Sequence, residues 1–152
     1  MNYSFVPHIT LVYPFLPADG IESVIARLEM VAVNTRPFRL TLEGIEYFQT
    51  INNVAYIAIK EKELLQALVS DIIKSIKDVI TGYYAEKEYD ANHYIPHMTI
   101  GEKIPAHIFP EVKKRFAGYR IDREIEVKNF SLAGENNGLW EQLRTFKLEK
   151  GN

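Results

Sequence analysis

Two short motifs with the same residue pattern carry the side chains best suited to chemistry in this chain. The sequence has Pro-His-Ile-Thr at residues 7–10 and Pro-His-Met-Thr at residues 96–99. In a strand, side chains two residues apart point to the same face, so the histidine and the threonine of each motif share a face. The intervening hydrophobic residue points the other way, into a core. The four candidate catalytic residues are His8, Thr10, His97 and Thr99.

Two imidazoles and two hydroxyls are sufficient for transfer at a phosphodiester. A neutral imidazole can take the proton from the attacking water or hydroxyl, and an imidazolium can protonate the leaving oxygen. An imidazole in a model peptide titrates near pH 6.5, so both forms are accessible near neutral pH. The threonine hydroxyls would donate hydrogen bonds to the non-bridging phosphate oxygens and stabilise the developing charge. This chemistry requires no metal and no other cofactor, and it leaves open which histidine is the acid.

A structural interpretation of the motifs stays open beside the catalytic one. A single His-x-Thr on a half-buried strand is more often structural, but two matching copies favour function. An old duplication that preserves only a structural pattern is the alternative. His93 and His97 have the i, i+4 spacing of a metal pair on a helix, but Pro96 interrupts such a helix and no acidic or cysteine partners are apparent. We therefore expect no metal site, and we expect His107 to be a surface residue.

Aromatic side chains near the motifs could stack on a nucleobase, although aromatic residues in strands usually pack in a core. Tyr13 and Tyr94 are the candidates for substrate binding among them. The full set comprises Tyr3, Phe5, Tyr13, Phe48, Tyr94 and Trp140.

The elements that must position the motifs follow from hydrophobic periodicity and from turn residues. The pattern predicts strands at 6–13, 38–48, 54–60, 96–102, 123–134 and 139–148. Helical spacing of apolar residues predicts helices at 21–34, 61–81 and 105–117. The strands at 38–60 and at 123–148 are expected to form hairpins.

The predicted elements repeat along the chain. Each half has Pro-His-x-Thr on a strand, then a short helix, then a hairpin turned at Asn-Asn. The halves cover roughly 1–60 and 96–150, and the helix at 61–81 joins them. We therefore expect one two-lobed domain over residues 1–152 with a pseudo-twofold axis, in which both polar motif faces line one cleft.

Composition narrows the class of protein. The 152 residues include no cysteine, which excludes thiol nucleophiles, zinc-thiolate sites and disulfides. The net charge of −2 argues against binding along duplex DNA, but leaves room for a nucleotide or an RNA end. No apolar run approaches the roughly 20 residues of a membrane span, and the first residues do not form a signal peptide. We expect a cytoplasmic protein without a membrane partner.

The paired motifs resemble those of the two-histidine (2H) phosphoesterase superfamily, within it the 2′–5′ RNA ligase-like or cyclic phosphodiesterase-like bacterial branch. The resemblance covers nearly the whole chain, including the sequences NNVAYIAIK and GLWEQLRTFKL. It implies a duplicated, bilobal α+β fold with two antiparallel sheets facing a central cleft and with helices on the outside. It also implies the two histidines as acid and base and the two threonines as phosphate binders. Members of the superfamily act, without a required metal, on 2′,3′-cyclic ends, on 1″,2″-cyclic ADP-ribose phosphate or on 2′–5′ linkages.

The start of the chain departs from this pattern. Members of the superfamily usually place a strand and a helix before the first motif, whereas seven residues precede His8 here. A missing strand would expose a sheet edge, so we expect a monomer or a dimer formed through the N-terminal lobe. The arginine-bearing loop of some ligase-like members is not found, which makes tRNA-type substrates less favoured.

Three functional hypotheses remain. The first is a phosphoesterase acting on a nucleotide or an RNA end, and retention of all four motif residues favours it. The second is a catalytically inactive module that binds a nucleotide or an RNA end, and the short N-terminal segment favours it. The third is a structural or interaction protein. Turnover separates the first from the second, and a ligand-induced rise in melting temperature separates the second from the third.

Overall fold

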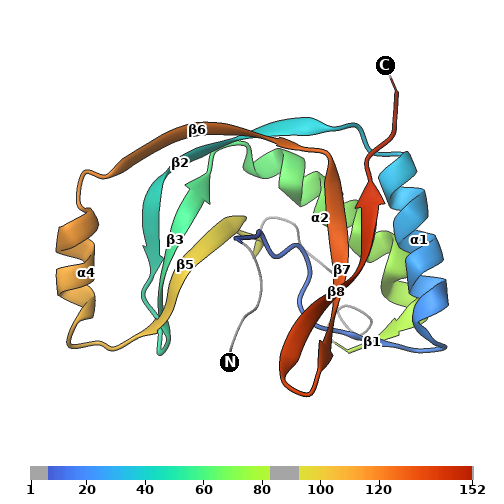
Figure 1. Ribbon diagram of the computed structural model, residues 1–152, viewed down its shortest axis with the longest axis horizontal. Coiled ribbons are helices and arrows are strands. Elements are labelled where there is room, and N and C mark those ends of the chain that lie inside the picture. Colours follow the sequence, from blue (N-terminus) through green and yellow to red (C-terminus); the bar gives the residue numbers. More distant parts are fainter. Residues whose placement is uncertain (1–6, 83–92, 152) are drawn as a thin grey trace.

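The structure is a computed structural model that describes residues 7–82 and 93–151. It is an α+β fold, as the resemblance to the two-histidine superfamily implies, and all strand pairs among the described residues are antiparallel (Figure 1). The helices are α1 (Ile21–Val33), α2 (Lys62–Ile76) and α4 (Phe109–Phe116). The strands are β1 (Leu16–Pro17), β2 (Phe38–Phe48), β3 (Asn53–Ile59), β4 (Ile80–Thr81), β5 (His97–Ile104), β6 (Arg120–Val127), β7 (Asn129–Asn136) and β8 (Leu139–Lys147).

A four-stranded sheet of order β5-β3-β2-β6 forms one side of the molecule. The hairpin of β2 and β3 confirms the hairpin predicted at 38–60. The sheet combines strands that precede α2 with strands that follow it, so strand pairing crosses the division between residues 1–60 and 96–150. Strands β2 and β3 bury Leu40, Leu42 and Ile59 under α2. The outer edge of each strand remains open for pairing, so β6 pairs with β2 and β5 pairs with β3.

Residues 120–136 form two strands where the sequence predicts a single strand at 123–134. β6 ends at Val127 and pairs with β2, whereas β7 begins at Asn129 and pairs only with β8 among the described residues. Figure 1 shows the chain arching over the top of the molecule as β6 and then turning down into β7. The strand breaks because its apolar residues belong to two cores: Ile125 packs beside Leu40, and Phe130 packs beside α1.

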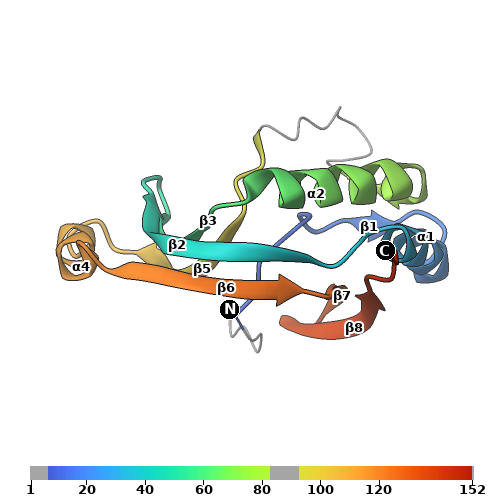
Figure 2. The same ribbon diagram turned by 90° about the horizontal axis from the view of Figure 1, so that it is seen from above.

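Helix α2 covers one face of the four-stranded sheet, which Figure 2 shows from above. Its buried residues recur at helical spacing and form a continuous apolar stripe. They are Leu65, Leu68, Val69, Ile72, Ile73 and Ile76. The helix ends at Ile76, short of the predicted end at residue 81, and a 3₁₀ turn at Lys77–Val79 follows. The β-branched residue Ile80 then reaches the same core from an extended strand, β4, which pairs with β1.

The second sheet is the hairpin of β7 and β8, packed on α1. The predicted turn is confirmed: Asn137 and Gly138 have φ values of 52° and 79°. Positive φ at both central residues is the requirement of a two-residue type I′ turn. Phe130, Leu132 and Phe146 bury their side chains against the apolar face of α1, whose predicted bounds of 21–34 are confirmed within one residue.

The strand predicted around the first motif and the helix predicted after the second motif have different bounds in the structure. Of the strand expected at 6–13, the described part contains one isolated bridge, between Ile9 and Met98. The helix expected at 105–117 begins at Phe109, where Pro110 takes the first-turn position that the sequence suggested for Pro105. Over the described ranges, no helix is both long and apolar enough to cross a bilayer.

Candidate active site on the two His-x-Thr segments

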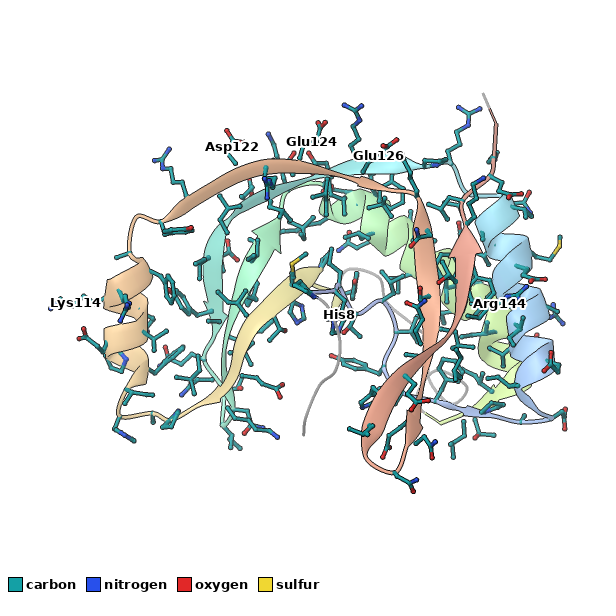
Figure 3. All side chains as sticks on the ribbon, viewed as in Figure 1. His8, Lys114, Asp122, Glu124, Glu126 and Arg144 are labelled. Carbon is teal, nitrogen blue, oxygen red and sulfur yellow. The ribbon has the colours of Figure 1, made fainter. Side chains whose placement is uncertain are left out.

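A single antiparallel bridge between Ile9 and Met98 brings the two motifs side by side. In an antiparallel ladder, the next positions along the two chains also face each other. His8 therefore lies across from Thr99, and Thr10 lies across from His97. Because side chains alternate along each segment, all four motif side chains point to the sheet face opposite to that of Ile9 and Met98. Figure 3 shows His8 near the middle of the molecule, beside β5, whereas Lys114 and the acidic side chains of β6 lie at the periphery.

Strand β5 is held in place by β3. His97 pairs with Ala58, and Thr99 pairs with Tyr56. The alternate residue Met98 pairs with Ile57, which packs against the core beneath α2. The apolar side of the strand thus anchors the second motif, while the small side chain of Ala58 leaves space for the neighbouring imidazole.

The imidazole of His97 is oriented by a hydrogen bond and by ring packing. Its Nδ1 atom lies 2.8 Å from the carbonyl oxygen of Ile95. A carbonyl can only accept, so Nδ1 carries the hydrogen and Nε2 is the nitrogen left to take or give a proton. The ring also meets Phe48 and Tyr56 edge-on, with centroid distances of 5.1 Å and 5.3 Å.

The sequence did not single out two residues near the second motif: Tyr56, beside His97, and Glu46, beside Tyr56. Tyr56 is almost fully buried, and its hydroxyl donates a 3.0 Å hydrogen bond to Glu46. Burial, with the hydrogen bond and the charge of Glu46, raises the pKa of Tyr56 to about 12. The hairpin predicted at 38–60 contains both residues. Its antiparallel pairing could have indicated that Glu46 and Tyr56 lie opposite each other. Their link to the motif depends on the pairing of β3 with β5.

The two aromatic candidates for substrate binding have different surroundings. Tyr94 is half-buried and packs against both cores, and its hydroxyl donates to the carbonyl oxygen of Thr10 at 2.8 Å. It therefore joins the two motif segments. Tyr13 has a side chain that is 67 % exposed. Tyr3 and Phe5 lie outside the described residues, and Trp140 lies on the β7–β8 hairpin.

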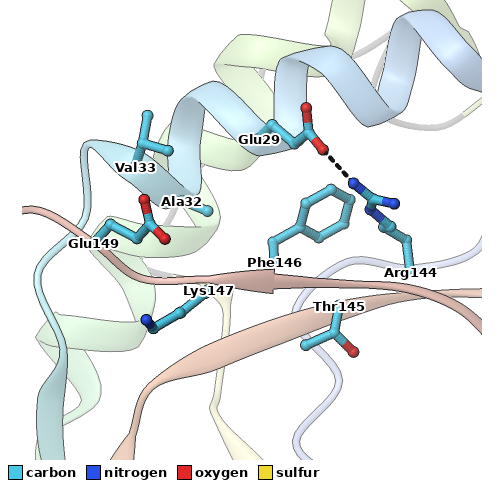
Figure 4. Close-up of a pocket in the computed structure, with 8 residues that line it drawn as sticks. All are labelled: Glu29, Ala32, Val33, Arg144, Thr145, Phe146, Lys147 and Glu149. Carbon is cyan, nitrogen blue, oxygen red and sulfur yellow. Dashed lines mark hydrogen bonds and ion pairs between the residues drawn. The ribbon is translucent and has the colours of Figure 1, made fainter.

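The remaining histidines, His93 and His107, both have exposed side chains. Within residues 7–82 and 93–151, no group of three or more acidic, histidine or cysteine side chains is arranged to hold a metal ion. His107 is exposed on the turn that precedes α4. A hollow of about 260 Å³ lies elsewhere, between α1 and β8, where Arg144 and Glu29 form a 2.8 Å ion pair (Figure 4). None of the residues that line this hollow belongs to either motif.

Comparison with known proteins identifies the family and the fold. A "Putative phosphoesterase" of Bacillus anthracis (strain A0248) is 31 % identical over 155 residues, which cover 99 % of this chain and 84 % of that protein. A "Putative phosphoesterase" of Bacillus cereus (strain B4264), BCB4264_A1283, is 30 % identical with the same coverage. The crystal structure of TT0787 of Thermus thermophilus has the same fold, with a TM-score of 0.73 at 20 % identity over 96 % of this chain and 80 % of that one. The model of the 2′-5′ RNA ligase superfamily matches residues 3–139, and this chain therefore belongs to that superfamily.

Proposed function

We propose that this protein is a phosphoesterase that acts on a 2′,3′-cyclic phosphate or a 2′–5′ phosphodiester of RNA or of a small nucleotide. His8 and His97 act as the acid–base pair, and Thr10 and Thr99 bind the phosphate. The observation that supports the proposal most directly is the Ile9–Met98 bridge, because its register gives both motifs one common face. Membership of the superfamily and the phosphoesterase names of the Bacillus relatives support it independently.

The chemistry can be written as one displacement at phosphorus. In hydrolysis of a cyclic phosphate, the oxygen of water bonds to phosphorus, and the bond from phosphorus to one ribose oxygen breaks. One imidazole takes the proton of the water, and the other gives a proton to the ribose oxygen that leaves. The product is a phosphomonoester with a free neighbouring hydroxyl. In ligation, a hydroxyl of a second RNA end takes the place of water, and the same two proton transfers accompany its bond to phosphorus and the departure of the ribose oxygen.

The orientation of His97 is compatible with either role, as the acid or as the base. With Nδ1 donating to Ile95, the free Nε2 atom lies at the outer end of the ring and can exchange a proton with substrate. The crossed arrangement, in which each histidine faces the threonine of the other motif, suits a phosphate between them. Each hydroxyl would then bind a phosphate oxygen beside the imidazole of the opposite segment.

The test is turnover of a panel of 2′,3′-cyclic nucleotides and 2′–5′ dinucleotides in EDTA. Wild type is compared with His8→Ala, His97→Ala and the double variant, and exposed His107→Ala is the matched control. We expect each single loss to lower kcat by about 10²–10⁴-fold, while the control keeps wild-type activity. Turnover that neither single substitution reduces would refute the proposed site. Ligand-induced stabilisation without turnover would favour the inactive binding module instead.

A further inference from the structure

Tyr56 on β3 borders both His97 and Thr99 of the second motif. It pairs directly with Thr99 on β5, and its ring centroid lies 5.3 Å from that of His97. On its other side it pairs directly with Glu46 on β2. Paired residues share a sheet face, so Glu46, Tyr56 and Thr99 form a row across three strands on the motif face.

The ring of Tyr56 is fixed from two directions. Its hydroxyl donates to Oε2 of Glu46 at 3.0 Å. Its face stacks on Phe48, with a centroid distance of 4.3 Å and an interplanar angle of 27°. Phe48 in turn meets the imidazole of His97 edge-on. The three rings form one packed cluster, so a displacement of Tyr56 changes the packing of the imidazole.

Tyr56 is poorly suited to act as an acid or a base itself. Its side chain is only 4 % exposed, and its pKa is raised to about 12 by burial and by Glu46. The phenol therefore stays protonated across the physiological range, and its hydrogen is directed to the carboxylate of Glu46. What Tyr56 offers to the motif is a rigid surface.

We propose that Tyr56, anchored by Glu46 and Phe48, is a positioning residue that sets the orientation of the His97 imidazole and of the Thr99 hydroxyl. The hydrogen bond from Nδ1 to Ile95 fixes one nitrogen of the imidazole, and the aromatic cluster fixes the plane of the ring. The inference rests on the proposed function, because it assigns these two groups to catalysis. It adds Tyr56 of the β2–β3 hairpin, which lies outside the two motifs, to the residues that support catalysis.

The kinetic test uses variants that remove the anchor and leave the ring. Tyr56→Phe deletes only the hydroxyl, and Glu46 is exposed, so its carboxylate returns to water. We expect kcat to fall by about 10- to 100-fold with little change in KM, because the imidazole loses its orientation. Glu46→Ala should have a similar effect, and Glu46→Gln, which keeps an acceptor, should recover most of the loss. Tyr47→Phe is the matched control, since Tyr47 lies on the other face of β2 and packs against Phe109.

A spectroscopic test needs no substrate and so remains informative if the proposed function fails. The ring nitrogens of the histidines are followed by ¹⁵N NMR in wild type, Tyr56→Phe and Tyr47→Phe. We expect Tyr56→Phe to shift the Nε2 and Nδ1 signals of His97, to leave those of His107 unchanged, and to unfold at a temperature close to that of Tyr47→Phe. Unchanged His97 signals, or a Tyr56→Phe enzyme with wild-type kcat, would overturn the positioning role. Shifted signals in a protein without turnover would support the role and count against the proposed function alone.

Discussion

The hydroxyl of Tyr94 donates a 2.8 Å hydrogen bond to the backbone carbonyl of Thr10 and thereby ties the segment before the second motif to the first motif. The carbonyl of Tyr94 is itself held by Nε2 of Gln66 on α2, at 3.1 Å. The segment around Thr10 also has a backbone bridge to β5, between Ile9 and Met98. The hydrogen bond from Tyr94 to Thr10 therefore adds a further contact between the two motif segments. The spacing of the two motifs therefore depends on a side chain that neither motif contains.

Tyr94→Phe should consequently impair both stability and catalysis. Loss of one hydrogen bond of this kind costs about 0.5–1.5 kcal/mol, which urea unfolding would measure as a lower midpoint. We also expect a lower kcat, because the first motif is less firmly placed against the second. Tyr119→Phe is the control, since Tyr119 is 60 % exposed and packs only on the neighbouring α4 residue Phe116 among the ring contacts described. Equal midpoints and equal kcat for the two variants would contradict this role.

Removal of either motif hydroxyl should weaken catalysis without unfolding the protein. Thr10→Val and Thr99→Val keep a β-branched shape at exposed positions but cannot donate to phosphate. We expect kcat to fall by about 10²–10³-fold for each, and serine at the same positions to restore most of it. Thr145→Val provides the comparison, because its hydroxyl bonds with Ser131 and Gln142 on the other sheet. Serine variants no better than the valine variants would argue against the hydroxyl as the working group.

The two-histidine mechanism predicts a bell-shaped dependence of kcat/KM on pH. One imidazole must be neutral and the other protonated, so activity falls when both are in the same state. We expect His8→Ala and His97→Ala each to abolish one limb in the residual activity, which would identify the acid and the base. A profile that stays flat between about pH 5 and 8 would be incompatible with this mechanism.

A carboxylate outside the two motifs should make stability depend on pH. Glu61 accepts hydrogen bonds from the amide and the hydroxyl of Thr41, at 2.6 Å and 2.9 Å, and joins the start of α2 to β2. The Thr41 amide bond, foremost, lowers the pKa of Glu61 below 4.5. The group therefore stabilises the fold above its ordinary pKa, and this contribution is lost as pH falls through the lowered value.

Glu61→Gln should lower the urea midpoint at pH 7, and the difference from wild type should shrink below about pH 4. Asp71→Asn, which removes a carboxylate from an exposed site on the same helix, controls for the change in net charge. A constant difference across this pH range would show that the Glu61 charge is not the source of the stabilisation.

Local patterns predicted the elements whose partners are close in sequence. The hairpin at 38–60 follows from alternation and a polar turn, and the β7–β8 turn follows from Asn137-Gly138, which tolerates positive φ. The apolar stripe identified α2 but overshot its end, because Ile80 lies at the same helical spacing and enters the core from a strand instead. Likewise, alternation continues through residues 123–134, so it could not reveal that the two ends of this stretch pack in different cores.

The sequence by itself determined which side chains form each motif and that each histidine shares a face with its threonine, since both follow from the two-residue period of a strand. Only the tertiary structure decided that the two segments adjoin, in the register that sets His8 across from Thr99 and Thr10 across from His97. It also decided that Tyr56 adjoins the second motif, with Glu46 on the far side of Tyr56. The physical reason is that cross-strand neighbours far apart in the chain are selected by core packing and register, and a shift of one residue would turn every side chain to the other face.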